Sequence, residues 1–207
     1  TGTPWGHVGP WNIFDDKDNK GEAGTLSDAA SPEKNPNLIY TGGHNNGVSS
    51  GILKSVDGGV HWTRNSTGMW DTRIIGVFVH PSDPMGSHVL AGTATGIYES
   101  KDGAGSWKLL NETIGWGIIS FQEITIDGKQ YIAGSTGSFI ATVPVSGGLW
   151  QKTTAGKSVS PKGLQVGGIS TVTTAGKSET VTCDAFGSGK LYYGSFDSPT
   201  QITWSDP

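Results

Sequence analysis

The chain has 207 residues, a formal charge of −4 and only 15% charged residues, while glycine fills 33 positions and tryptophan eight. This length fits a single domain. Two arginines, Arg64 and Arg73, and scattered lysines are too few to neutralise a phosphate backbone, so we expect no nucleic-acid partner. No apolar run approaches the ~18 residues of a membrane-spanning helix, so we expect no membrane partner either.

Residues 1–24 form the first segment, which we expect to close the domain. The chain begins at Thr1 rather than Met, which is consistent with the removal of a targeting segment. Residues 16–21 partly resemble a calcium loop, but Lys20 replaces an oxygen ligand and Ser27 stands where a bidentate acid belongs. We therefore predict no cofactor, with calcium as the alternative.

From residue 25 onward, short β-rich runs alternate with clusters of turn-forming residues, and helical periodicity is almost absent. One meander of four strands is expected at 74–79, 88–92, 96–100 and 106–110. The second strand recurs at 38–42, 89–92, 131–134 and 180–183. The third strand recurs at 51–55, 96–100, 138–142 and 190–194.

A tryptophan marks the fourth strand of each unit, at intervals of 45, 43 and 54 residues, in Trp62, Trp107, Trp150 and Trp204. A four-stranded unit that repeats every ~40–45 residues is typical of a β-propeller blade. The expected blades span residues 25–65, 72–111, 117–155 and 164–206.

The hairpins between third and fourth strands share a motif. Residues 55–62 have the pattern S-x-D-x-G-x-x-W, and residues 100–107 repeat it with Ala104 in place of the glycine. Residues 143–150 retain only the glycine and the tryptophan, and residues 195–204 stretch the pattern by two positions.

This motif resembles the Asp-box of bacterial-neuraminidase-repeat (BNR) propellers, and the resemblance covers about residues 25–204. The proline-containing corners at 31–37 and 80–84 are similar to those of sortilin-like and xyloglucanase-like members, and sialidase-like propellers carry the same box. The resemblance implies an all-β propeller of four-stranded antiparallel blades and says little about activity.

The Asp-box has a structural explanation. A carboxylate that accepts backbone N–H groups in a tight turn fixes a hairpin, glycine supplies a positive φ, and tryptophan packs between neighbouring blades. We therefore predict structural rather than catalytic roles for Ser55, Asp57, Gly59, Trp62, Ser100, Asp102 and Trp107.

Two features bear on the cellular compartment. N-glycosylation sequons begin at Asn65 and Asn111, each shortly after a box tryptophan. A single cysteine, Cys183, excludes a disulfide framework within the chain, and its strand-like flanks favour a buried free thiol. We predict a secreted glycoprotein.

Four blades leave the closure of the ring open, because Asp-box propellers usually have more than four. The chain is then part of a larger ring that a second chain, a homo-oligomer or a removed segment completes. The alternative is a small four-bladed ring that residues 1–24 close.

The loops opposite the Asp-boxes are the expected functional surface. They carry His44, Asn45 and Asn46, and the connections between blades carry Trp70 and Trp116. An exposed tryptophan beside polar side chains suits a sugar ring. The alternatives are that both tryptophans pack between blades and that His44 is a solvated hydrogen-bonding group rather than a base.

Asp71 is the best-placed single carboxylate, and Arg73 nearby would hold it ionised. A glycoside hydrolase needs a second carboxylate, for which Asp15, Asp16, Asp28 or a residue of the missing half are candidates. The alternative is that Asp71 caps a turn. Sialidase activity of this chain alone is excluded, since it would need three arginines to clamp the substrate carboxylate.

These observations lead to a secreted, carbohydrate-active propeller. The first hypothesis is a glycan-cleaving, glycoside hydrolase-like subunit with Asp71 as a catalytic residue. The alternatives are a lectin-like module that binds glycans and a sortilin-like scaffold that binds a protein.

Overall fold

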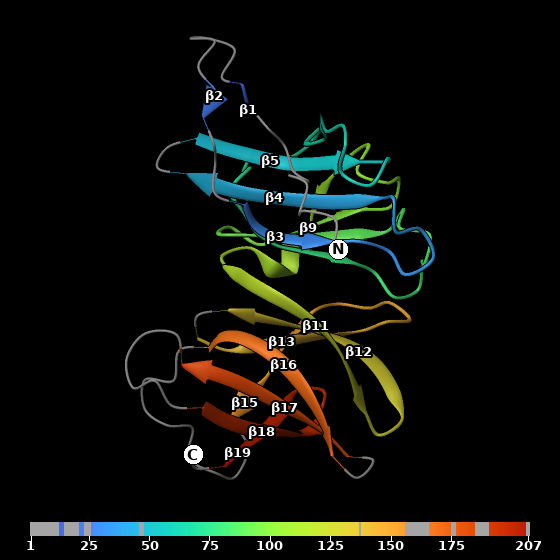
Figure 1. Cartoon of the computed structure of the whole chain (residues 1–207). Coiled ribbons are helices and arrows are strands. Elements are labelled where there is room, and N and C mark those ends of the chain that lie inside the picture. Colours follow the sequence, from blue (N-terminus) through green and yellow to red (C-terminus); the bar gives the residue numbers. More distant parts are fainter. Residues whose placement is uncertain are drawn as a thin grey trace, which may run out of the picture.

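The computed structural model describes residues 13–14, 21–22, 26–45, 48–136, 138–155, 166–174, 177–184 and 191–205. These residues are almost entirely β-structure, in four antiparallel meanders that follow one another along the chain (Figure 1). No helix within these ranges is long and apolar enough to cross a membrane.

The first two blades contain four strands each. The first consists of β3 (Leu26–Ala30), β4 (Ile39–Asn45), β5 (Val48–Ser55) and β6 (Thr63–Arg64). The second consists of β7 (Ile74–Val79), β8 (Val89–Thr93), β9 (Ile97–Ser100) and β10 (Lys108–Leu109). A single 3-10 turn, η1 (Asn111–Thr113), follows the second blade. A separate short hairpin joins β1 (Ile13–Phe14) to β2 (Gly21–Glu22).

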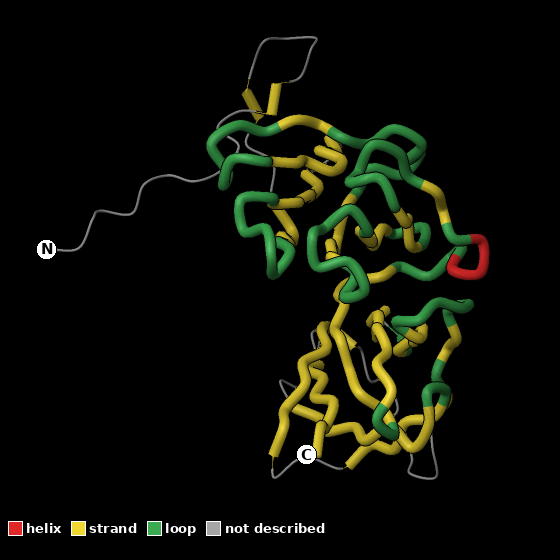
Figure 2. Tube along the Cα trace, turned by 90° about the vertical axis from the view of Figure 1, so that its right-hand side faces the viewer, coloured by secondary structure: helices red, strands yellow, loops and turns green. Residues whose placement is uncertain are grey.

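The third and fourth blades have longer strands (Figure 2). The third consists of β11 (Ile118–Ile126), β12 (Lys129–Thr136), β13 (Ile140–Pro144) and β14 (Gln151–Lys152). The fourth consists of β16 (Val166–Thr174), β17 (Lys177–Asp184), β18 (Leu191–Ser198) and β19 (Gln201–Ser205). Its outer strand β19 also pairs in parallel with β15 (Thr154–Ala155), a fifth strand that the four-strand repeat did not predict.

The four meanders are arranged radially, as the propeller prediction requires. Their first strands contact one another in succession, β3 with β7, β7 with β11 and β11 with β16. The first and fourth blades lie towards opposite ends of the molecule (Figure 1). Of the predicted closing segment 1–24, the structure describes only β1 and β2, and the rest of that prediction lies outside the described residues.

Apolar clusters between consecutive blades form the core. The second strands contribute a glycine where the next blade approaches. A Cβ atom on Gly92 would lie 2.8 Å from the carbonyl oxygen of Ile118, and one on Gly42 would lie 2.6 Å from the Cβ of Ile74. Glycine at these positions therefore allows the blades to pack closely.

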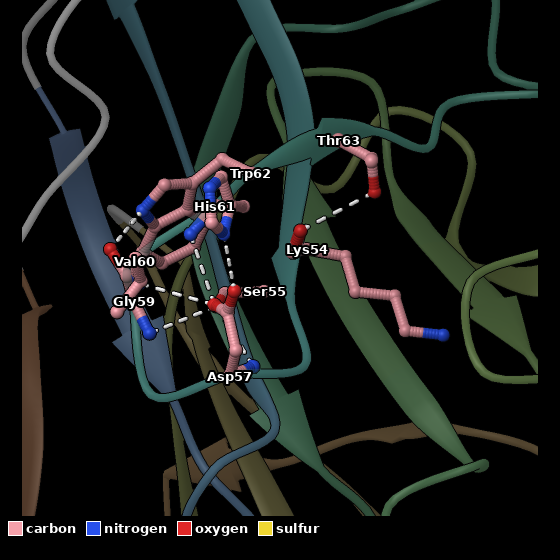
Figure 3. Close-up of polar contacts among 8 residues, drawn as sticks. All are labelled: Lys54, Ser55, Asp57, Gly59, Val60, His61, Trp62 and Thr63. Atoms are coloured by element: carbon pink, nitrogen blue, oxygen red, sulfur yellow. Dashed lines mark hydrogen bonds and ion pairs between the residues drawn. The ribbon is translucent and has the colours of Figure 1, made fainter.

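The first Asp-box has the predicted turn-locking geometry (Figure 3). Asp57 Oδ1 accepts the backbone N–H groups of Val60 and His61 at 3.1 and 2.9 Å. Ser55 Oγ donates to the same oxygen at 2.8 Å and accepts the N–H of Gly59 at 2.8 Å. Hydrogen bonds, first of all from the His61 backbone, hold the pKa of Asp57 far below its usual range.

The second box repeats this arrangement. Asp102 Oδ1 accepts the N–H of Ser106 at 2.9 Å and the hydroxyl of Ser100 at 2.8 Å. Hydrogen bonds, first from the Ser106 side chain, lower the pKa of Asp102 to about 2. In both turns the aspartate accepts backbone N–H groups of its own hairpin, which is the arrangement that the predicted structural role requires. Ala104 adopts φ +67° where Gly59 of the first box has φ +94°, so it occupies the left-handed region without glycine's freedom.

The box tryptophans pack towards the preceding blade. Trp107, Trp150 and Trp204 are buried, and the Trp107 indole N–H donates to the carbonyl oxygen of Asn65 in the first blade at 2.8 Å. Trp62 is only half-buried and donates to Gly59 of its own turn instead. The interblade role predicted for Trp62 is therefore not filled within the described residues, because the first blade has no preceding blade there.

Candidate functional site

The connection between the first and second blades forms an exposed surface at the end opposite the Asp-boxes. Trp70 lies on this connection with 69% of its surface exposed. The backbone N–H of Gly51 in β5 donates to the Thr72 carbonyl oxygen at 3.1 Å, which ties the connection to the first blade. A large aromatic side chain is thus presented to solvent from an anchored loop.

Asp71 lies behind this surface, with its side chain 5% exposed. Its Oδ1 accepts the backbone N–H of Arg73 at 3.1 Å and lies 3.4 Å from Arg73 Nε. Its own backbone N–H donates to the Tyr98 hydroxyl at 3.3 Å. This is the geometry of a turn-capping acid, the alternative that the sequence left open. Its Oδ2 is buried and has no partner among the described residues.

Arg73 is the ion-pair partner of Asp71. The side chain of Arg73 is 57% exposed and that of Asp71 is 5% exposed, so Arg73 is the member of the pair that solvent reaches, three residues along the same connection from Trp70. The carboxylate therefore positions the guanidinium, and a ligand at this surface would meet Trp70 and Arg73 first.

Trp116 occupies the equivalent connection one blade later and has a different environment. It is half-buried and its ring packs edge-on against Phe139, with centroids 5.3 Å apart and an interplanar angle of 86°. It belongs to the apolar cluster between the second and third blades. Trp116 therefore packs between blades, and the structure does not bring it together with Trp70 as one exposed surface.

The remaining predicted site residues are described only in part. His44 and Asn45 end β4 and pair with Ser49 and Val48, while their side chains and the whole of Asn46 lie outside the described residues. The predicted box residues are those of the turns above. The sequon asparagines Asn65 and Asn111 lie just after the box strands, and their glycosylation stays a prediction.

A second catalytic carboxylate is not found beside Asp71 in the described part of the chain. Both oxygens of Asp28 accept backbone N–H groups, from Ala29 at 2.8 Å and from Val77 at 2.9 Å, so this carboxylate joins the first two blades. Asp15 and Asp16 lie outside the described residues. Within the described ranges there is also no group of three or more His, Cys, Asp or Glu residues that could hold a metal ion.

Two adjoining cavities lie instead at the Asp-box end. One of about 550 Å³ lies where corners of the first three blades meet, lined among others by Glu33, His80 and Glu123. The other, of about 300 Å³, lies between the second and third blades and also contacts His80. No sequence motif predicted a functional site at this end of the molecule.

A polar cluster lines the smaller cavity. His80 is 6% exposed and stacks on His88 with ring centroids 3.9 Å apart and an interplanar angle of 6°. His88 Nε2 lies 2.7 Å from Glu99 Oε1, and Lys101 Nζ lies 3.4 Å from Glu99 Oε2. Burial, followed by the nearby His88, lowers the pKa of His80 to about 4. The hydrogen bond from His88 is the main factor that lowers the pKa of Glu99.

Solved structures with a similar fold are propellers. An ancestral GH74 enzyme matches with a TM-score of 0.64 and 18% identity, over 87% of this chain and 24% of that one. The GH74 xyloglucanase from Xanthomonas campestris matches with a TM-score of 0.57 and 13% identity, over 88% and 30%. YCF48 bound to a D1 peptide matches with a TM-score of 0.55 and 16% identity, over 87% and 53%.

These likenesses define the class of fold. The chain has a β-propeller fold, and it spans between 24% and 53% of the length of these three structures. No family model matches the chain, and no curated protein does.

Proposed function

We propose that this chain is part of a secreted propeller that binds carbohydrate at the surface of Trp70 and Arg73. The observation that carries the proposal is the 69% exposure of Trp70 on a connection fixed to the first blade. An indole face stacks on the C–H face of a sugar ring, and the guanidinium of Arg73 donates to its hydroxyl groups. The propeller fold is shared with GH74 enzymes, one of which is a xyloglucanase, so xyloglucan is the first ligand to test.

Glycan cleavage is the further activity that we propose for the assembled protein. A glycoside hydrolase needs two carboxyl groups across the scissile bond. The side chain of Asp71 is 5% exposed, so it would act on the substrate only after Arg73 moves aside. We propose that the second carboxylate comes from further blades, which a second chain or further copies of this chain supply.

The test uses affinity electrophoresis of the whole chain in gels that contain xyloglucan. We expect the wild-type chain to be retarded, and Trp70→Ala to migrate as it does without polysaccharide. Leu149→Ala is the matched control, because Leu149 is equally exposed, at 68%, but lies in the third blade. Retardation that survives in Trp70→Ala would remove Trp70 from the proposal.

A second candidate is a protein-binding scaffold, and the specific observation in its favour is the likeness to YCF48 bound to a peptide. In this case the same exposed tryptophan would contact a polypeptide. Capture of an extended peptide by the wild-type chain, with no response to any glycan, would support this second function over the first.

A further inference from the structure

The junction between the second and third blades is built differently from the junction before it. Between the first two blades, the Tyr40 hydroxyl donates to the Gly86 carbonyl oxygen at 2.8 Å, and Lys54 Nζ donates to that of Gly103 at 2.7 Å. Tyr40 and Lys54 are cross-strand partners in β4 and β5. Two long side chains therefore reach across this junction and fill it.

The equivalent cross-strand pair of the second blade is Leu90 and Glu99. Leu90 is shorter than tyrosine, and Glu99 turns towards His88 and Lys101 of its own blade rather than to the third blade. The facing turn, residues 143–150, lacks the serine and aspartate of an intact Asp-box. These changes leave the cavity of about 300 Å³, which falls at the lower end of the usual range for ligand sites.

His80 offers a hydrogen-bond donor at this cavity. Its Nδ1 accepts the backbone N–H of Ser82 at 3.2 Å and lies 2.8 Å from the Ser82 hydroxyl. Because a backbone N–H can only donate, the neutral ring carries its proton on Nε2. No described residue accepts a hydrogen bond from Nε2, and Nε2 is not fully buried, because Asp71 Oδ2 is the one fully buried side-chain atom without a partner in the described ranges. A ligand oxygen that takes the place of water at the cavity would accept this proton.

Of the charged side chains that line the cavity, Glu99 is paired with basic groups, whereas Glu112 has no ion pair among the described residues. His88, Glu99 and Lys101 form a chain in which the carboxylate faces both basic groups. The second ring nitrogen of His88 has no partner in the described ranges. With no unpaired buried cation available, the site favours a neutral ligand that hydrogen-bonds over a phosphate or a carboxylate.

The other side of the cavity is apolar, and its strands are already paired. Leu90, Val143 and Trp150 line it and are 2%, 6% and 5% exposed. β9 pairs with β10, and β13 pairs with β14, so a peptide cannot extend either sheet here. A cavity with polar side chains on one wall and apolar side chains on the other suits a sugar, which has hydroxyl groups on its rim and C–H groups on its faces.

From this geometry we infer that the cleft between the second and third blades is a binding site for one unit of a neutral sugar. His80 and His88 hydrogen-bond its hydroxyl groups, and the apolar wall of Leu90 and Val143 contacts its ring. This site lies at the Asp-box end and does not depend on Trp70, so the two sites can fail separately.

The test is NMR of the histidine ring protons of the whole chain at pH 7, during titration with cellobiose, maltose, mannobiose and xylobiose. We expect saturable shifts of the His80 and His88 signals with at least one disaccharide at millimolar concentration. His61 is the internal control, since it also pairs with a carboxylate, Asp57 at 2.6 Å, but lies at the exposed first box. Its signal should not move.

Two variants complete the test. Ser146→Trp places a large side chain at the exposed rim of the cavity and should weaken the sugar response at least tenfold, whereas Trp70→Ala should leave it intact. No shift with any of the four disaccharides overturns the inference. Equal shifts at His61, or shifts caused by a proline-containing tetrapeptide but by no sugar, overturn it as well.

Discussion

At the scale of single residues, polar side chains in this propeller act through the backbone. Asp57, Asp102 and Asp28 all accept backbone N–H groups, and Asp71 caps the turn that leads to Arg73. These four carboxylates therefore serve turns and the contact between blades. Of the residues that the sequence predicted for the site, Trp70 and Arg73 are exposed to a ligand.

His80 gives the stability of the protein a specific pH dependence. The pKa of its ring is about 4 in the folded chain, against an ordinary value of 6.5, so the unfolded chain binds the extra proton first. The stabilising effect of the neutral ring is complete above pH 6.5 and is lost as the pH falls from 6.5 towards 4. In urea unfolding across this range, the urea concentration at the midpoint should decrease as the pH is lowered from 6.5 to 4.

The variant His80→Gln isolates this contribution. It should flatten the pH dependence between 6.5 and 4, whereas His61→Gln, at an exposed histidine, should leave it unchanged. If the urea midpoint depends on pH equally in the wild-type chain and in His80→Gln, the result would contradict the burial of a neutral imidazole at His80.

At the scale of strands and blades, close approach depends on small side chains in the second strand. Gly92→Ala would place a Cβ atom 2.8 Å from the Ile118 carbonyl oxygen, which requires the second and third blades to move apart. We expect a loss of about 1–3 kcal/mol in unfolding free energy. Gly117→Ala is the control, since its Cβ would meet its nearest neighbour at an ordinary 3.6 Å. Similar denaturant midpoints for the two variants in chemical unfolding would show that the close contact between position 92 and Ile118 does not determine how tightly the blades pack.

The sequence predicts the blades well because their signals are local. Turn residues, the Trp spacing and the box at 55–62 are properties of short segments, and their hydrogen bonds stay within the hairpin. The sequence cannot distinguish Trp70 from Trp116, because the difference arises from Phe139, a contact across blades. The addition of β15 to the fourth blade likewise depends on a partner 47 residues away in the chain.

The polar cluster of the interblade cavity was missed for a similar reason. His80, His88 and Glu99 come from three separate places along the second blade, and no motif joins them. A comparison of equivalent cross-strand pairs would have given a signal. The replacement of Tyr40 and Lys54 by Leu90 and Glu99 marks the junction that lacks bridging side chains.

At the scale of the whole molecule, we propose that the ring is incomplete, because half-buried Trp62 meets no preceding blade among the described residues. The tryptophan of the next blade donates to the blade before it, whereas Trp62 turns back to Gly59. We therefore predict a particle larger than the 21.6 kDa of one chain when mass is measured by light scattering after size exclusion. A monodisperse monomer with no partner would instead support the small closed ring.

Exposed Trp70 is the side chain on which we propose that a glycan stacks. Acrylamide quenching of tryptophan fluorescence, with and without xyloglucan oligosaccharide, measures this directly, because Trp70 is the most exposed tryptophan of those described. We predict that the oligosaccharide protects the wild-type chain from quenching and has no effect on Trp70→Ala. Equal quenching of the wild-type chain with and without oligosaccharide, or protection that persists in the variant, would contradict the claim.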